Sequence, residues 1–184
     1  MIEAAHPTCV VELWAFDEHR VGLLPLVRKV WAKHGSRPVR IVQTRYHWLY
    51  LYGFVQPQTG RCHFLRLPRM NATLYNQALA DFAQAVGAGV HQQVVLLVDG
   101  AGSHRSHAVI VPPGLHLIAL PPYSPELQPA EKLWSLTNEP LVNRHFATLP
   151  ELEAVQAARC ETMAAMRAPV RSQTLFHCWP RIIK

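Results

Sequence analysis

The sequence predicts an α/β fold in which a mixed β-sheet is flanked by helices. Two short runs, 10–16 and 94–98, are apolar and rich in β-prone residues, as buried strands are. Segments 48–55 and 61–67 are typical of a hairpin, and three later segments carry helical signals. A hairpin is antiparallel, whereas strands joined through helices are parallel, so the sheet should be mixed.

Length and composition predict one globular domain, spanning 1–184 with a core at about 8–168 and a tail at 169–184. Of the 184 residues 49% are hydrophobic and only 16% are charged, which excludes a disordered chain. The formal net charge is +6, which favours a polyanionic partner.

The four cysteines and the N-terminal sequence predict a cytoplasmic protein. No cysteine belongs to a C-x-x-C pair, so we expect free thiols rather than a zinc knuckle. The first residues show neither a basic region nor an apolar run typical of a signal peptide. No apolar stretch reaches the ~18 residues of a membrane span, so no membrane association is expected.

The first half of the chain should form three strands. Segment 10–17 is predicted to be a central strand, and 21–35 is basic and irregular because Pro25 opposes a long helix. The hairpin pairs 48–55 with 61–67, and Gly60 supplies its turn.

The second half adds helices and two buried strands. Segment 71–86 has helical spacing, with Asn71 as N-cap and Gly87 as terminator. Strands are predicted at 92–99 and 115–120, and helices at 128–138 and 149–167. Pro129 is tolerated at a helix start, and Pro140 should end that helix. Segment 172–184 gives no prediction.

Three carboxylates stand out by position. The chain has only three aspartates, and two of them, Asp17 and Asp99, directly follow the apolar runs, where an unpaired charge is costly. Glu131 lies in the first turn of a predicted helix. Each has an ordinary reading: Asp99-Gly as a turn, Asp17 paired with Arg20, and Glu131 as a helix-dipole contact.

Together the three carboxylates predict a metal site. Strand ends and a helix start can meet at one edge of a sheet, and three carboxylates at one point would bind a hard cation. Two metal ions ~3.5–4 Å apart can activate an attacking oxygen and stabilise a leaving one. Phosphodiester chemistry is the reaction class that this arrangement favours.

Three ordered sequence blocks resemble the bacterial insertion-sequence branch of the mariner-like DDE transposases. The first is Asp17-Glu-His-Arg with Trp31-Ala-Lys-His-Gly35, and the second is Leu97-Val-Asp-Gly-Ala-Gly-Ser-His104-Arg-Ser. The third and most specific is Pro-Tyr-Ser-Pro-Glu-Leu-Gln-Pro-Ala-Glu131-Lys-Leu-Trp134. The 31 residues between Asp99 and Glu131 are close to the family's spacing.

The resemblance implies an RNase H-like fold with a five-stranded mixed sheet. It implies that Asp17 bridges two Mg²⁺ or Mn²⁺ ions and that Asp99 and Glu131 each complete one. His104 would be an active-site neighbour. The implied activity is cleavage of double-stranded DNA at transposon ends and transfer of the 3′-hydroxyl into target DNA, by a homodimer.

The chain departs from the family pattern at the third block and at its N-terminus. Gln128 replaces the usual asparagine and Ala130 a branched residue, so we expect a weaker helix cap. Only 16 residues precede Asp17, so we expect a catalytic core without the helix-turn-helix region. A second reading frame of a split element, a truncated copy and an excised domain all fit.

Other polar residues receive secondary roles. Glu18 should point to the face opposite Asp17, Glu126 should be structural, and Asp81 should lie on a solvated helix face. His19 and His107 are weaker site candidates than His104. Trp14, Trp31, Trp48 and Trp134 are expected in the core. The basic residues are expected either on a solvated face or against the DNA backbone: Arg20, Arg28, Lys29, Lys33, Arg37, Arg40, Arg45, Arg105 and Lys132.

Two other functions use the same residues. An RNase H-like nuclease or resolvase would hydrolyse DNA without joining it. A catalytically silent remnant would bind DNA or a partner, and its thermal stability would not respond to magnesium.

Overall fold

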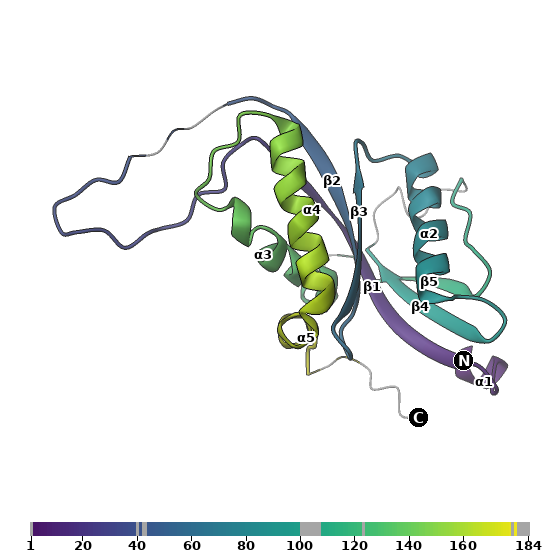
Figure 1. Ribbon diagram of the computed structural model, residues 1–184. Coiled ribbons are helices and arrows are strands. Elements are labelled where there is room, and N and C mark those ends of the chain that lie inside the picture. The colour runs from purple at the N-terminus through teal and green to yellow at the C-terminus, as the bar shows by residue number, and fades with distance from the viewer. Residues whose placement is uncertain are drawn as a thin grey trace.

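A computed structural model describes residues 2–39, 41, 44–99, 108–122, 124–177 and 179. Five strands form one mixed sheet in the order β3-β2-β1-β4-β5, flanked by helices on both faces (Figure 1). The strands are β1 (Val10–Gly22), β2 (Trp48–Gln56), β3 (Arg61–Leu67), β4 (Gln92–Val98) and β5 (Leu115–Ala119). The helices are α1 (Ile2–Ala5), α2 (Ala72–Val86), α3 (Leu133–Thr137), α4 (Leu149–Ala165) and α5 (Arg167–Thr174), with 3₁₀ turns η1 (Pro125–Leu127), η2 (Pro129–Lys132) and η3 (Glu139–Leu141).

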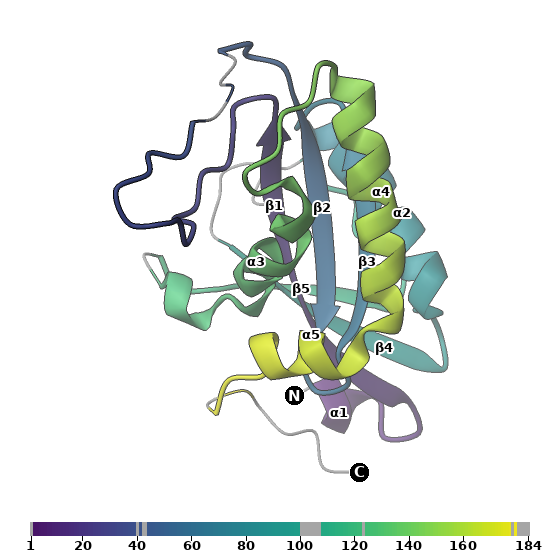
Figure 2. The same cartoon turned by 60° about the vertical axis from the view of Figure 1, so that its left-hand side comes forward.

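The two faces of the sheet carry different cores. Helix α2 covers one face, where Trp14, Phe16 and Phe54 pack against Leu79 and Phe82. Helices α3, α4 and α5 cover the other face (Figures 1 and 2). Side chains alternate along a strand, so every second residue of β1 faces the α3–α5 layer. The predicted class, a mixed five-stranded sheet between helices, is confirmed.

Strand β1 is longer than expected, and this corrects the position of Asp17. It continues through Asp-Glu-His-Arg to Gly22, because β2 pairs with it antiparallel from Ala15 to Gly22. Strand β4 pairs with β1 in parallel only as far as Ala15, opposite Leu97. Asp17 therefore does not end β1. It lies where β1 has lost β4 as a paired neighbour and keeps only β2.

The hairpin and helix α2 form as the sequence indicates. Gly60 has φ 73° in the β2–β3 turn. The Asn71 side chain accepts a hydrogen bond from the Leu74 backbone N–H, and Gly87 ends α2 in the left-handed conformation. Strand β4 stops at Val98, so Asp99 lies one residue beyond it.

The last three helices differ from the predictions in their boundaries. The predicted helix at 128–138 begins as the 3₁₀ turn η2 and becomes α-helical only at Leu133. Helix α4 ends at Ala165 instead of 167, and Met166 separates it from α5. Helix α5 extends into segment 172–184, which has no predicted structure, and it buries Val170 and Thr174.

The expectation that Trp31 belongs to the core is wrong. Trp14 is 1% exposed, whereas Trp31 is fully exposed in the segment between β1 and β2, which extends away from the sheet (Figure 1). No strand pairs with the described part of this 23–47 loop, so the sheet offers its side chains no core. Trp48 is 38% exposed at the start of β2 and Trp134 is half-buried.

Two composition-based expectations can be compared with the described residues. Cys9, Cys62 and Cys160 are free thiols, as expected. Among the residues that the structure describes, no helix has the length and apolar character needed to cross a bilayer.

Candidate active site

Asp17 lies on the part of the central strand β1 that pairs with a neighbouring strand on one side only. Its partner on β2 is Gly53, and on the β4 side the ladder has already ended. Alternation places Asp17 on the same face as Ala15, which packs with Ala130 and Leu133. The carboxylate is half-buried and faces the η2–α3 segment.

Trp134 of α3 holds the Asp17 carboxylate. The indole Nε1 donates a hydrogen bond of 2.8 Å to Oδ2 of Asp17. The indole reaches this position by crossing β2 at Gly53, where a Cβ atom would lie 2.6 Å from Cη2 of Trp134. Only glycine leaves room for the ring here, so Gly53 contributes to placing Asp17.

His19 extends the same row of contacts. Its ring stacks on Trp134 with centroids 4.9 Å apart and an interplanar angle of 15°. Its Nε2 lies 3.1 Å from Oδ1 of Asn138, one helical turn beyond Trp134. Burial lowers the pKa of His19, which favours the neutral ring. Asp17 and His19 of β1 thus both contact Trp134, and His19 also contacts Asn138.

Gln128 fixes the start of η2, contrary to the expected weak cap. Its Nε2 donates a hydrogen bond of 2.9 Å to the backbone oxygen of Phe16, and its Oε1 accepts one from the Ala130 N–H. The side chain is 2% exposed. Its extra methylene, compared with asparagine, lets one amide cap the turn and reach β1. The turn carrying Glu131 is thereby tied to the residue before Asp17.

The charge of Glu131 acts on the Asp17 carboxylate. The pKa of Asp17 is raised from 3.8 to about 7, mainly by burial. The Trp134 hydrogen bond opposes this rise, while the charges of Glu18 and Glu131 add to it. None of the ion pairs between described residues involves Asp17. The buried Asp17 carboxylate therefore has a tryptophan N–H and no cation among its side-chain partners in the described part of the chain.

Asp99 lies at the end of the neighbouring strand. Ala15 is paired with Leu97, so Asp17 and Asp99 each lie two residues beyond the last paired residues of adjacent strands. Adjacent strands run about 4.8 Å apart. The Asp99 charge also raises the pKa of Tyr75 on α2, after the larger effects of burial and two nearer groups. Within the described part of the chain, no three His, Cys, Asp or Glu side chains are close enough to hold a metal.

The remaining predicted site residues are scattered. His104, Arg105, His107 and Arg40 lie outside the described residues. The Arg20 guanidinium lies 5.1 Å from the Trp48 ring centroid, and Arg28 forms a 2.8 Å ion pair with Glu139. Lys29, Lys33 and Arg37 are exposed on the 23–47 loop. Lys132 is exposed, with its Nζ 6.0 Å from the Phe176 ring centroid.

Three further carboxylates lie outside the set Asp17, Asp99 and Glu131. Glu18 raises the pKa of Tyr52 and Tyr75, which lie on the α2 side. Glu126 is exposed in η1. Asp81 is exposed and accepts a 2.8 Å contact from Nε2 of His63. None of these three joins Asp17 and Glu131 on the α3 side.

Sequence reasoning missed the residues that hold the carboxylates in place. Trp134 was expected in the core and His19 carried little weight. Asn138 and Gly53 had no role. A signal did exist for Trp134, which lies three residues after Glu131 in the third block, one helical turn away. No pattern in the sequence marks Gly53, because its role depends on a ring from a residue far along the chain.

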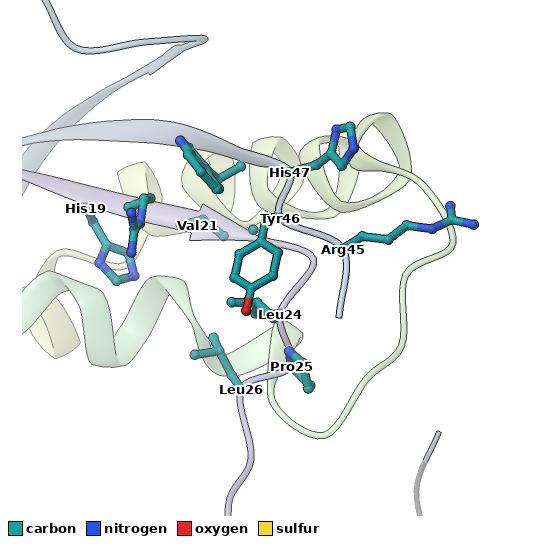
Figure 3. A pocket seen from close by; sticks show the side chains of 11 residues that line it. His19, Val21, Leu24, Pro25, Leu26, Arg45, Tyr46 and His47 are labelled. Atoms are coloured by element: carbon teal, nitrogen blue, oxygen red, sulfur yellow. The ribbon is translucent and has the colours of Figure 1, made fainter. Parts of the chain in front are cut away.

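A cavity of about 350 Å³ lies next to this row of contacts, at the base of the 23–47 loop. Figure 3 shows Tyr46 between the ends of the loop, near Leu24, with the Arg45 side chain directed away from it. His19 contributes to this cavity and also stacks on Trp134. The cavity therefore adjoins the candidate site through one shared side chain.

Comparison with known proteins identifies relatives of this fold. The chain resembles the Mos1 strand transfer complex, with a TM-score of 0.57, 15% identity, and coverage of 90% of this chain and 55% of that chain. The Mos1 mariner paired end complex with Mn gives a TM-score of 0.59 and 16% identity, with coverage of 90% of this chain and 56% of that chain. A simian T-cell lymphotropic virus intasome gives a TM-score of 0.53 and 13% identity, with coverage of 96% of this chain and 58% of that chain. The chain thus spans about half the length of these proteins, and the likeness establishes the RNase H-like fold.

Sequence comparison gives the family. An uncharacterised protein of Sinorhizobium fredii, y4pE/y4sA, is 37% identical over 100 residues, which are 54% of this chain and 73% of that protein. The family model of the DDE superfamily endonucleases matches residues 12–153, which include Asp17, Asp99 and Glu131. The chain belongs to the DDE superfamily of endonucleases.

Proposed function

We propose that this chain is the catalytic domain of a DDE transposase that cuts double-stranded DNA at transposon ends and joins the freed 3′-hydroxyl to target DNA. The observation that carries the proposal is the position of Asp17. Asp17 lies at the point where β1 separates from β4, Asp99 follows the end of β4, and the charge of Glu131 is among the causes that raise the pKa of Asp17. The membership in the endonuclease superfamily and the likeness to Mos1 complexes support it.

The residues at this place fit a divalent metal. Asp17, Asp99 and Glu131 offer only carboxylate oxygens, which Mg²⁺ and Mn²⁺ prefer. Burial, together with the charges of Glu18 and Glu131, raises the pKa of Asp17 to about 7, and a bound cation would favour the ionised form. Asp17, Asp99 and Glu131 would be the residues that hold the ions. Such ions polarise phosphate and lower the pKa of the attacking oxygen.

The protein's own residues would orient these ligands. The Trp134 N–H holds Oδ2 of Asp17. Gln128 ties the start of the turn that carries Glu131 to β1, next to Asp17. DNA would contact the exposed basic residues of the 23–47 loop, and two copies of the chain would act on paired ends.

One observation favours a second function. No three-ligand cluster exists among the described residues, as expected for a catalytically silent domain that binds DNA or a partner. The two functions differ in their response to magnesium. A metal bound by the native state raises the unfolding temperature, whereas the silent domain shows no change.

Purified protein, a duplex carrying the terminal sequences that flank its gene, and MgCl₂ form the direct test. We expect nicked or joined products from the wild type, and none from Asp99→Asn. Glu126→Gln is the matched control, because Glu126 is exposed and sits apart from Asp17 in η1. Products from Asp99→Asn equal to wild type contradict the role of Asp99. Nicked products without joined ones would indicate a nuclease or resolvase.

A further inference from the structure

A basic groove lies at the end of the sheet where the β2–β3 turn meets α5. Its volume is about 520 Å³, and Thr59, Arg167, Arg171, Ser172 and Leu175 belong to its lining, with Ala168. Among these described lining residues, two are arginines, two carry hydroxyls and none is acidic. None of these residues has a role predicted from the sequence.

The two arginines stand close together without an acidic partner. Arg167 and Arg171 are four residues apart on α5, and both are exposed. Like charges at this spacing disfavour a helix. None of the ion pairs between described residues includes either guanidinium. A helix of eight residues therefore carries a charge arrangement that an anion in the groove would offset.

The groove is built on fixed backbone. Val170 and Thr174 of α5 are buried in the core, while Arg167 and Arg171, three or four residues away along the same stripe of the helix, are exposed. The other wall is the β2–β3 turn, where a Cβ on Gly60 would collide with the backbone oxygen of Arg167. Turn and helix thus pack in direct contact.

The groove is joined to the carboxylate-bearing segment. Ala130 and Leu133 pack in one cluster with Val170 of α5. Lys132, which follows Glu131, has its Nζ 6.0 Å from the Phe176 ring centroid, just beyond α5. Figure 2 shows α5 and α3 on the same face of the sheet. Lys132 and the two arginines of the groove therefore lie on the same side of the sheet.

We propose that this groove binds backbone phosphates of the double-stranded DNA whose phosphodiester bond is presented to Asp17 and Glu131. The inference rests on the proposed function, and it adds a contact surface separate from the 23–47 loop. Arginine guanidinium groups and hydroxyls bind phosphate oxygens without reading sequence. Arg167 and Arg171 would position the duplex and touch no reacting atom.

Salt dependence of DNA binding tests the groove independently of catalysis. The assay is fluorescence anisotropy of a short labelled duplex with the full chain in EDTA, between about 50 and 200 mM salt. Each lost phosphate contact lowers the slope of log K against log salt by about 0.9. Arg167→Gln/Arg171→Gln should therefore lower it by about 1.8 and weaken binding at the low-salt end by about tenfold.

The control is Arg66→Gln/Arg69→Gln, which removes the same charge near the other end of β3. Equal slopes for the two double variants overturn the proposal. Arg167→Lys/Arg171→Lys should retain the wild-type slope, and the single change Arg167→Gln should lower it by about 0.9 if the double variant fails to fold.

Two further measurements separate DNA binding by the groove from catalysis and from binding of an acidic protein. Asp99→Asn should bind the duplex as the wild type does, so loss of cleavage and loss of groove binding are distinguishable. Poly-glutamate is the competing occupant. If the double glutamine variant loses poly-glutamate binding but keeps its duplex slope, the groove serves an acidic protein and the proposal fails.

Discussion

The indole N–H of Trp134 donates a 2.8 Å hydrogen bond to Asp17, which lies 117 residues earlier in the chain. Trp134 also stacks on His19, two residues after Asp17, and passes over Gly53 on the next strand. One side chain of α3 thus contacts both β1 and β2.

Trp134→Phe removes the hydrogen bond and keeps an aromatic ring. The bond lowers the pKa of Asp17, so its loss should raise that pKa above about 7. Bonds to charged groups contribute about 1.5–3 kcal/mol, so metal-dependent cleavage should fall by at least tenfold near neutral pH and recover partly at higher pH. The pH profile of cleavage is the measurement. Trp48→Phe is the control, and an identical profile for the two variants would contradict the role of Trp134.

Gly53→Ala should displace the Trp134 ring, because the new Cβ would lie 2.6 Å from Cη2. We expect about 1–3 kcal/mol of destabilisation in urea unfolding, with loss of cleavage. Gly89→Ala is a matched control with open space around its Cβ. In the double variant with Trp134→Phe the smaller ring should relieve the clash, so the two costs should be less than additive. Additive costs would show that the two residues do not interact.

Asp17 should make stability depend on pH. Its pKa is about 7 in the folded state and 3.8 in the reference state, so the folded protein binds more protons between these values. Stability contributed by the protonated carboxyl is therefore complete below pH 3.8 and is lost as pH rises through about 7. A shift of this size corresponds to at most about 4 kcal/mol.

Asp17→Asn removes this loss. It should be as stable as the wild type near pH 4 and more stable at pH 8, as measured by urea unfolding at both values. Asp81→Asn, on an exposed carboxylate, provides the control. A stabilising effect equal at both pH values would contradict the raised pKa of Asp17.

Gln128→Ala should leave the Phe16 carbonyl without its side-chain partner in a buried place. The expected loss is about 1–3 kcal/mol in urea unfolding. Gln173→Ala, at an exposed position of α5, should change stability by less than about 0.5 kcal/mol. If Gln128→Ala costs no more than this control, the η2 segment does not depend on its link to β1.

The sequence predicts the parts of the fold that local patterns determine. Apolar runs locate the buried part of β1 and β4, and Asn71 and Gly87 mark both ends of α2. The extension of β1 through Asp17 to Gly22 has no such signal, because its residues are polar and it exists through pairing with β2. The same holds for Trp31, whose exposure follows from a loop that the sheet does not cover.

The candidate site divides in the same way. Its carboxylates could be named from strand ends and from the third sequence block. Their supporting residues could not, since Trp134, Gly53 and Gln128 act across more than 70 residues of sequence. The family pattern at Gln128 even suggested a weaker cap, although its longer side chain makes two hydrogen bonds.

The central claim is that Asp17, Asp99 and Glu131 form one divalent-metal site, and Mn²⁺ binding followed by electron paramagnetic resonance tests it most directly. Wild type should bind Mn²⁺ at pH 8, and Asp17→Asn, Asp99→Asn and Glu131→Gln should each weaken binding by at least about tenfold. Glu126→Gln should bind as the wild type does. Wild-type affinity in Asp99→Asn, or equal losses in Glu126→Gln, would contradict the claim.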